Sequence, residues 1–370
     1  MANTLKFGNG EWYGKKDTIL AYNSENNNFK PLPFDFSRAS SATVVNKAGL
    51  IETVGSGEPR IDFKDNTKGA LKLEPSRTNL IPYSEDFSQW FQIGTATITS
   101  NYGVSPDGTQ NSSRLQMNAS DKIYFTVASS GDISFTVYLK GVGQIRLRDN
   151  TSTGLKDVTL TSEWVRYELN FNATISNFQI EQQTGVSDFE IYGAQLEQGS
   201  YATSYIPTSG SAVTRVADAC NNGANEQVIN STEGVFYAEV ENSSPSTSTR
   251  GWVLQSSLNN GSDLIGIRFN SSQLINFYLR ANSVTTINVN VSNTYNGFIK
   301  IALKYKSGEN SLWINGVEVH SNTTAFSFNN SLSNLGNYDG LGNYGYFNIK
   351  DTKLYNTALT DSELQKLTTI

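Results

Sequence analysis

A chain of 370 residues is longer than one hydrophobic core usually supports, so the sequence predicts two or three domains. Only 17% of the residues are charged, the formal net charge is -6 and the pI is about 5.0, which excludes nucleic acid and an anionic membrane as main partners. One cysteine and one histidine exclude disulfide frameworks and Cys/His zinc sites, and they argue against Cys-His or Ser-His catalysis within one chain.

The uncharged residues favour strands. Polarity comes mainly from Asn, Ser, Thr and Gly, which accompany 18 Tyr and 19 Phe, a mixture typical of pleated strands and tight turns. No run of 18 apolar residues occurs, and the first residues lack the basic and apolar regions of a secretory signal. We therefore expect an all-β protein without membrane insertion and without export through such a signal.

Residues 1–80 contain only short strand candidates, in segments 42–54 and 70–75, separated by Asn, Gly and Pro. A segment of this kind buries little apolar surface by itself, so it needs a neighbour to offset the entropy of its ordering. A sister chain or a docking partner is the expected neighbour. We therefore interpret residues 1–80 as an irregular region that anchors the chain to a larger assembly.

Residues 81–210 show clear alternation of apolar and polar residues, the signature of half-buried strands. In segment 132–141 the inward set is Ile133, Phe135, Val137 and Leu139. Segment 164–171 repeats the pattern with Val165, Tyr167, Leu169 and Phe171. Several short strands separated by turns predict a β-sandwich of the jelly-roll kind.

A small, polar segment, residues 211–224, is expected to link this domain to a second sandwich over residues 225–370. In the second sandwich, apolar and polar residues alternate over residues 299–305. Thr360 and Glu363 have the spacing of a capping box, so a short helix is predicted to begin there.

One hairpin of the second sandwich is predicted from two residues. Asn315 and Gly316 tolerate the positive φ angles that a type I′ turn requires. Pairing across this turn places Trp313 opposite Glu318, on the face away from the aliphatic core. An outward tryptophan can be a platform for sugar stacking, part of an interchain contact, or a residue covered by a neighbouring loop, and the sequence leaves all three open.

The C-terminal third resembles concanavalin A-like, laminin-G-like lectin domains, which commonly finish with a strand, a turn and a small helix. Its matching segments are residues 233–240, 301–319 and 347–367. The middle domain is similar in pattern to the jelly rolls of carbohydrate-binding modules. These resemblances imply lectin-like folds in both sandwiches.

Three other segments look like those shared among bacteriophage virion proteins, particularly head-fibre, tail-fibre and tail-spike chains. These are residues 36–63, 73–90 and 193–218. The resemblance implies assembly in the host bacterial cytoplasm, a place on the virion surface, frequently a homotrimer, and contact with other virion proteins through the N-terminal region. The implied function is adhesion to host-surface or environmental glycans, with a purely structural role in capsid or tail as the alternative.

Concanavalin A-like folds include glucanases, so the carboxylates need inspection. Those enzymes carry a Glu-x-Asp-x-x-Glu cluster on one strand, because a retaining hydrolase needs an acid and a nucleophile about 5 Å apart. Glu239 and Glu241 lie two residues apart, hence on one strand face, but the rest of the pattern is missing. We therefore expect that the protein is not an enzyme and that it uses no cofactor. A glycan depolymerase with its site between chains is a third hypothesis, after adhesion and a purely structural role, and the missing acidic pattern disfavours it.

Two groups of residues are candidates for ligands. In the loop 334–348, Asn337, Asp339 and Asn343 offer oxygen ligands for calcium, but a single carboxylate is fewer than tight sites use, and no metal site is expected. In the middle domain the outward set combines aromatic faces with guanidinium groups, the chemistry that binds glycans; its alternative role is to seal contacts between chains of an oligomer. This set is Tyr138, Arg146, Arg148, Trp164, Arg166 and Tyr192.

Overall fold

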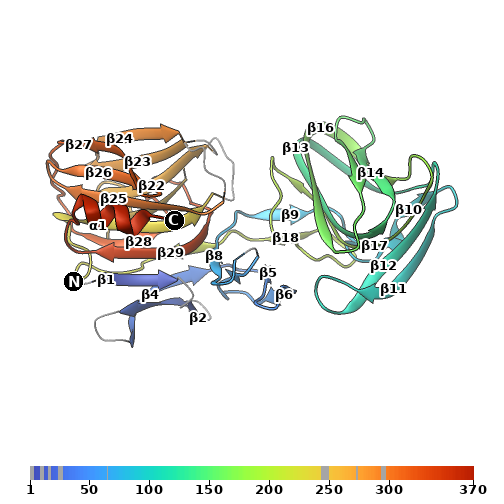
Figure 1. Ribbon diagram of the computed structural model, residues 1–370, viewed down its shortest axis with the longest axis horizontal. Coiled ribbons are helices and arrows are strands. Elements are labelled where there is room, and N and C mark those ends of the chain that lie inside the picture. Colours follow the sequence, from blue (N-terminus) through green and yellow to red (C-terminus); the bar gives the residue numbers. More distant parts are fainter. Residues whose placement is uncertain are drawn as a thin grey trace.

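Two β-sandwiches lie side by side in the protein, and a smaller region of short strands connects them (Figure 1). The computed structural model describes residues 4–8, 12–15, 18–23, 28–64, 66–242, 250–271, 274–292 and 297–370. Strands dominate both sandwiches, which confirms the predicted all-β class. No helix among these described residues has the length and apolar character that a membrane span needs.

The middle sandwich is a jelly-roll-like sheet that curves around its own core. Its strands follow the order β11-β12-β17-β13-β16-β14-β15, with β10 paired to β13. After the short 3-10 helix Phe87–Gln89, the strands are β10 (Phe91–Ile93), β11 (Thr97–Val104), β12 (Gln110–Asn118), β13 (Lys122–Val142), β14 (Gln144–Asp149), β15 (Leu155–Thr159), β16 (Val165–Glu181) and β17 (Val186–Gln198). The predicted inward residues Ile133, Phe135, Val137 and Leu139 have no exposed area, which confirms the inward set, but Ser134 and Thr136 on the opposite face are also buried.

The C-terminal sandwich packs two sheets around a second core. One sheet has the order β24-β23-β22-β21-β28, and the other includes the run β29-β20-β25-β26-β27. The bounds are β20 (Glu233–Glu241), β21 (Arg250–Ser256), β22 (Leu264–Ser271), β23 (Leu274–Ala281), β24 (Val284–Ser292), β25 (Ile299–Lys306), β26 (Asn310–Ile314), β27 (Val317–Asn322), β28 (Leu332–Gly336) and β29 (Asn348–Tyr355). Helix α1 (Asp361–Thr368) contacts β25, β26 and β27.

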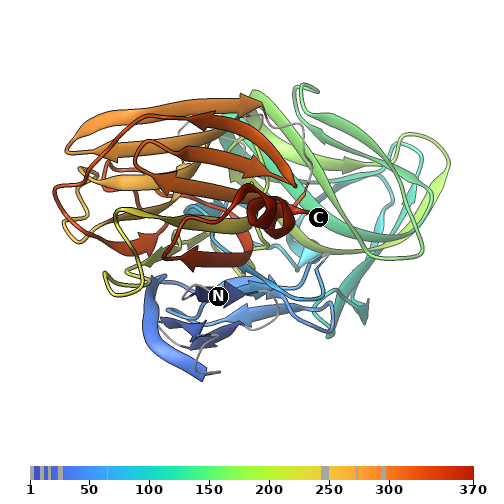
Figure 2. The same cartoon turned by 60° about the vertical axis from the view of Figure 1, so that its left-hand side comes forward.

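The N-terminal strands extend the C-terminal sandwich. Strand β1 pairs with β29, and the sheet continues through β3 and β4 to β19 (Ala219–Asn221). Figure 2 shows these strands along one side of the C-terminal sandwich. The N-terminal bounds are β1 (Thr4–Gly8), β2 (Tyr13–Lys15), β3 (Thr18–Asn23), β4 (Asn28–Ser37), β5 (Ala42–Val45), β6 (Ile51–Val54), β7 (Ile61–Asp62), β8 (Ala70–Lys72) and β9 (Arg77–Asn79).

The C-terminal core takes side chains from the N-terminal region. Phe34 and Leu73 have no exposed area, and Phe36 and Leu71 are almost as buried in the same core cluster. The neighbour that the first 80 residues need is therefore present within the same chain. The predicted domain boundaries remain predictions about which segments fold as units. Strand pairing and core packing nevertheless cross the predicted boundary at residue 80.

Two chain segments cross between the sandwiches as a paired ribbon. Strand β18 (Val213–Arg215) pairs antiparallel with β9, and β19 (Ala219–Asn221) pairs with β4. Both β18 and β19 lie within residues 211–224, which were expected to be a linker. Because the segment is hydrogen-bonded to residues far earlier in the chain, it is a structural element of the junction.

The predicted hairpin and helix are confirmed. Asn315 and Gly316 have φ angles of 49° and 85°, as the type I′ turn requires. Trp313 pairs with Glu318, as expected. In α1, the Thr360 side chain accepts from the backbone N–H at the third helical position, and the glutamate there accepts from the backbone N–H of Thr360, so the capping box is complete.

We expect Phe34→Ala to destabilise the C-terminal sandwich by about 3–5 kcal/mol, because it removes a fully buried ring that lies 5.3 Å from Trp252 and leaves a cavity. Urea denaturation measures the change. Phe91→Ala is the matched control, since Phe91 is 55% exposed on the middle sandwich. An unchanged unfolding midpoint for Phe34→Ala would show that the N-terminal strands do not belong to this core.

Candidate functional site

A buried network of five charged side chains lies where the two sandwiches meet. Asp218 forms ion pairs with Arg38, at 3.1 Å, and with Arg60. Glu74 forms ion pairs with Arg60, at 2.6 Å, and with Arg215, at 2.9 Å. None of the five side chains is more than 8% exposed. We call this set the junction network.

The junction network joins three segments that are distant in the sequence. Two of its arginines come from residues 36–63, its glutamate from residues 73–90, and its third arginine and its aspartate from residues 193–218. Ser204 joins the network by donating from its backbone nitrogen and its hydroxyl to Glu74, at 2.8 and 2.6 Å.

The network holds Glu74 in its charged form. Burial by itself would raise the pKa of this carboxyl, but Arg215 and Arg60 outweigh burial and hold the pKa well below its usual value. A buried ion pair of this kind stabilises little overall, because desolvation offsets much of the attraction. Removing one partner is costly, however, since it leaves a buried charge without compensation.

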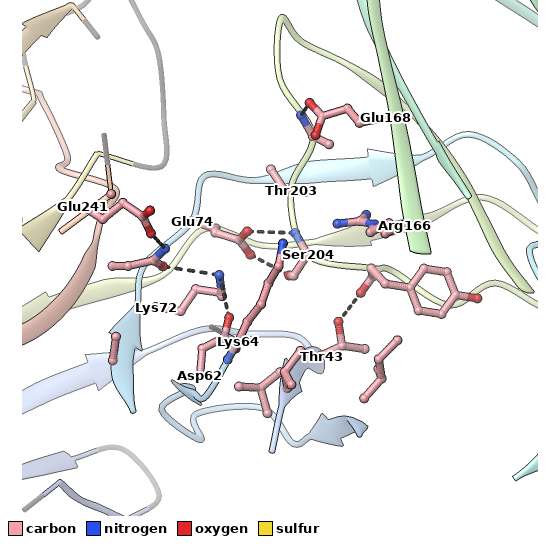
Figure 3. Close-up of a pocket in the computed structure, with 18 of the residues that line it drawn as sticks. Thr43, Asp62, Lys64, Lys72, Glu74, Arg166, Glu168, Thr203, Ser204 and Glu241 are labelled. Carbon is pink, nitrogen blue, oxygen red and sulfur yellow. Dashed lines mark hydrogen bonds and ion pairs between the residues drawn. The ribbon is translucent and has the colours of Figure 1, made fainter. Parts of the chain in front are cut away.

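Beside the junction network lies a cavity of about 440 Å³ (Figure 3). Its walls come from the short strands β5 to β8, from the middle sandwich with the segment that follows β17, and from the C-terminal sandwich. A cavity between domains is a common place for a small ligand. We therefore treat this interdomain cavity as the candidate functional site.

Several charged groups of the cavity are paired with one another. Lys72 forms an ion pair with Asp62 at 2.7 Å. The Asn348 side chain donates to Glu241 at 2.7 Å and accepts from Lys72 at 3.3 Å. This chain of contacts fixes the wall between the N-terminal region and the C-terminal sandwich, as Figure 3 shows.

Two cations and two aromatic rings complete the chemistry of the cavity. Lys64 is exposed, and Figure 3 shows its side chain pointing into the middle of the space. The Arg166 guanidinium donates to the Thr136 hydroxyl at 2.9 Å and lies 5.6 Å from the ring centroid of Tyr138. Tyr138 and Phe298 are partly exposed. The cavity therefore offers ring faces and hydrogen-bond donors together.

The structure brings together three of the predicted middle-domain residues. Tyr138 pairs across the sheet with both Arg166 and Tyr192. Tyr138 and Arg166 line the cavity, but Tyr192 is 2% exposed and lies behind them. The Tyr192 hydroxyl is 3.2 Å from a Glu85 oxygen and 3.1 Å from an Asp107 oxygen. Its prediction as an outward contact residue is wrong, because the loops carrying these two acids cover it.

Arg146 and Arg148 lie elsewhere, on β14. Arg146 forms an ion pair with Asp157 at 2.6 Å, and Arg148 forms one with Glu181 at 3.3 Å. Both side chains remain partly exposed. They do not line the cavity, so the six predicted residues do not form one site.

The two predicted tryptophans also lie outside the cavity. Trp164 donates to the backbone carbonyl of Val104 at 3.0 Å, and Lys140 lies 5.2 Å from the centroid of its ring. Trp313 is on the outer face of its sheet, as expected, but it is only 7% exposed because it packs in a cluster with Leu364 of α1. Trp313 therefore cannot serve as an open platform for a sugar. Of its three possible roles, that of a residue covered by a neighbouring segment fits, and α1 is that segment.

The loop that offers candidate oxygen ligands for calcium uses these oxygens within the protein. Asp339 accepts from Arg268 at 3.1 Å and from the Asn343 side chain at 2.9 Å. The side-chain oxygen of Asn337 accepts from the backbone N–H of Cys220 at 2.9 Å. An arginine thus already neutralises the one carboxylate of the trio. Within the described part of the chain, no group of three or more His, Cys, Asp or Glu side chains could hold a metal ion.

Sequence reasoning missed several residues of this site. Lys64 and Phe298 lie in loops without periodic pattern, so nothing local marks them as neighbours. The sequence contains only a weak indication of the junction network, because Arg215 and Asp218 lie in a segment that is otherwise poor in charged residues. The long-range pairings of β9 with β18 and of β4 with β19 bring these charges together.

Residues 225–365 match the family described as the Concanavalin A-like lectin/glucanases superfamily. The C-terminal sandwich is therefore a concanavalin A-like domain with a lectin-like β-sandwich fold. No curated protein sequence matches the chain.

Several solved structures are distantly similar. The Ruminococcus gnavus IT-sialidase CBM40 bound to alpha2,3 sialyllactose is 16% identical, with a TM-score of 0.32, over 38% of this chain and 84% of that chain. Domain 4 of AbnA, a GH43 extracellular arabinanase from Geobacillus stearothermophilus, in complex with arabinotriose, is 14% identical, with a TM-score of 0.31, over 46% and 82%. Trypanosoma rangeli sialidase is 10% identical, with a TM-score of 0.32, over 95% and 65%. At these scores the likeness supports no conclusion about binding or activity.

We expect the protein to lose stability in acid partly through Glu74. Because the folded pKa lies well below the value of about 4.3 in unfolded chains, the contribution of this carboxylate is present above about pH 4.3 and disappears as the pH falls through the folded pKa. Glu74→Gln should therefore lower the melting temperature at pH 7 and flatten its decline below about pH 4.3.

Melting curves between pH 7 and pH 3 measure this effect. Glu226→Gln is the control, because Glu226 is exposed and outside the network, and its profile should follow that of the unmodified protein. An equally steep acid decline in Glu74→Gln would show that the junction network does not hold this carboxylate charged.

Proposed function

We propose that the chain is a non-enzymatic structural protein of a phage virion, a head or tail fibre or spike, that binds glycans in its interdomain cavity. The observation that carries the proposal is the cavity itself, which is walled by a concanavalin A-like domain and a jelly-roll sandwich. Adhesion to host-surface or environmental glycans is the role that such a site would serve.

The lining of the cavity fits a saccharide. The partly exposed rings of Tyr138 and Phe298 can contact the apolar face of a sugar. Lys64, Arg166 and Asn348 surround these rings with groups that can bond sugar hydroxyls. A ligand pocket that combines apolar surface with a few fixed polar groups is the usual design for small ligands.

The virion assignment is supported by the segments that build the junction network. Residues 36–63, 73–90 and 193–218 resemble phage fibre and spike chains, and these same segments form the junction between the sandwiches. On this proposal the chain assembles in the host cytoplasm as a homo-oligomer, most simply a trimer. Its N-terminal region contacts other virion proteins, and the protein lies on the virion surface.

The proposal of a non-enzymatic role is supported by the contacts of the acids near the cavity. Glu239 forms an ion pair with Lys350 at 2.9 Å, and Glu241 accepts from Asn348. Glu74 is held by two arginines. A glycosidase needs one carboxyl that stays protonated and a second that attacks or activates water, and these acids are engaged otherwise.

A purely structural role in capsid or tail is the second candidate. It is favoured by the outward arginines of the middle sandwich, because Arg146 and Arg148 are neutralised by carboxylates of the same chain. Arg114 likewise forms an ion pair with Asp188 at 2.5 Å. A surface whose charges are internally paired suits a spacer as well as it suits a receptor.

We expect the full chain to bind a subset of glycans on an array, and Tyr138→Ala to weaken that binding about fivefold, because an aromatic contact to a ligand contributes about 1 kcal/mol. Tyr102→Ala is the matched control, since Tyr102 is 46% exposed on β11 and lies outside the cavity. Titration calorimetry with the bound glycan measures the affinities of both variants.

The outcomes separate the candidates. If the chain binds no glycan, the purely structural role remains as the candidate function. Equal loss of affinity in both tyrosine variants would show that the glycan does not bind in the cavity. Release of reducing sugars from host polysaccharide would contradict the non-enzymatic assignment. Imaging of gold-labelled protein on intact particles tests the place on the virion.

A further inference from the structure

We infer that the interdomain cavity selects saccharides that carry a carboxylate, held between Lys64 and Arg166. This inference rests on the proposed glycan binding and adds the chemical class of the ligand. It follows from which cations of the cavity have a carboxylate partner and which do not.

Most acids of the cavity are committed to other groups. Asp62 accepts from the backbone N–H of Lys64 with one oxygen and pairs with Lys72 through the other. Glu74 is buried between two arginines that lie behind the wall. Neither carboxylate is available to neutralise a further cation that points into the cavity.

The two remaining acids of the lining accept hydrogen bonds from uncharged donors, which do not neutralise a carboxylate, so their distance from the cations matters. Glu168 accepts from the backbone N–H of Ala202 at 3.2 Å and from the Asn170 side chain at 2.7 Å. Glu241 accepts from Asn348 at 2.7 Å. Figure 3 places Glu168 and Glu241 toward the edges of the drawn site, away from Lys64.

Lys64 is a cation without an ion-pair partner among the described residues. Its side chain is exposed and points into the space, whereas neighbouring Lys72 is engaged with Asp62. A lysine ammonium is a compact point charge with three donors, and it therefore suits a carboxylate oxygen. An uncharged hydroxyl would accept a hydrogen bond from this ammonium group but would not neutralise its charge.

Arg166 supplies the second cation, from a different element of the cavity wall. The ring of Tyr138 and the hydroxyl of Thr136 fix its guanidinium, and within the described residues it makes no ion pair. Its Nε, which is buried, also has no hydrogen-bond partner there. A guanidinium that is positioned but not neutralised is suited to a carboxylate, because charge-assisted hydrogen bonds are about twice as strong as neutral ones.

The two cations therefore stand on different walls of one space. Lys64 comes from the N-terminal region and Arg166 from β16 of the middle sandwich. A carboxylate between them would bridge the walls, while the sugar ring that carries it contacts Tyr138. Neutral sugars can enter the same space, but they leave both charges unpaired.

The experiment uses the full chain and two carboxylate-bearing probes, trigalacturonate and sialyllactose, each beside its neutral methyl ester. We expect at least one acid to bind about tenfold more tightly than its ester, because a hydrogen bond to a charged group contributes about 1.4 kcal/mol more than a neutral one, which corresponds to a tenfold difference in affinity. Lys64→Gln and Arg166→Gln should each remove most of this preference. Lys47→Gln is the matched control, since Lys47 is an exposed lysine in the turn between β5 and β6 and does not line the cavity.

Each outcome decides. Acid and ester binding equally for both probes would overturn the carboxylate preference while leaving glycan binding intact, and binding of no glycan at all would overturn the proposed function itself. Equal losses in Lys64→Gln and Lys47→Gln would show a general charge effect and overturn the assigned site. Arg166→Lys, which keeps the positive charge, is measured beside Arg166→Gln, and melting curves establish that both variants are folded. A preference for the acid over the ester that is retained in Arg166→Lys but lost in Arg166→Gln supports the role of the charge.

Discussion

The burial of Asp218 between two arginines is the constraint on which the rest of the architecture depends. Its two oxygens face Arg38 and Arg60, and none of the three side chains has exposed area. Such a group is tolerated only with its partners in place, because an uncompensated buried charge costs several kcal/mol. The segments before the middle sandwich and after it are therefore held together, and the β9–β18 ribbon runs between the two sandwiches in a fixed register.

The cavity adjoins this junction. Arg60 and Glu74 are paired and buried at this junction, and Glu74 also contributes to the lining of the cavity, so the network and the cavity share one wall. The same network stiffens the wall of the cavity, because Ser204 donates two hydrogen bonds to Glu74. A site with one rigid wall binds with less loss of side-chain entropy than a site made of loops alone.

Sequence reasoning reached what depends on local pattern and failed where pairing is distant. The alternation around Phe135 and the turn at Asn315 were readable, since period and φ preference are local properties. Tyr138 and Arg166 were identified as outward residues, but their union with Lys64 depends on segments about 70 to 100 residues apart. Trp313 was placed on the correct face, yet a pattern confined to its own hairpin cannot reveal that α1 covers that face.

Ligand binding and the assembly of the junction are thermodynamically linked in this arrangement. The cavity exists only when the N-terminal region, the middle sandwich and the C-terminal sandwich are in contact, because each contributes a wall. A ligand that binds the assembled form and not the open form stabilises it by RT ln(1 + [L]/Kd), about 2.7 kcal/mol at a hundredfold excess over Kd. Binding of a glycan between the sandwiches, as we propose, would therefore oppose their separation.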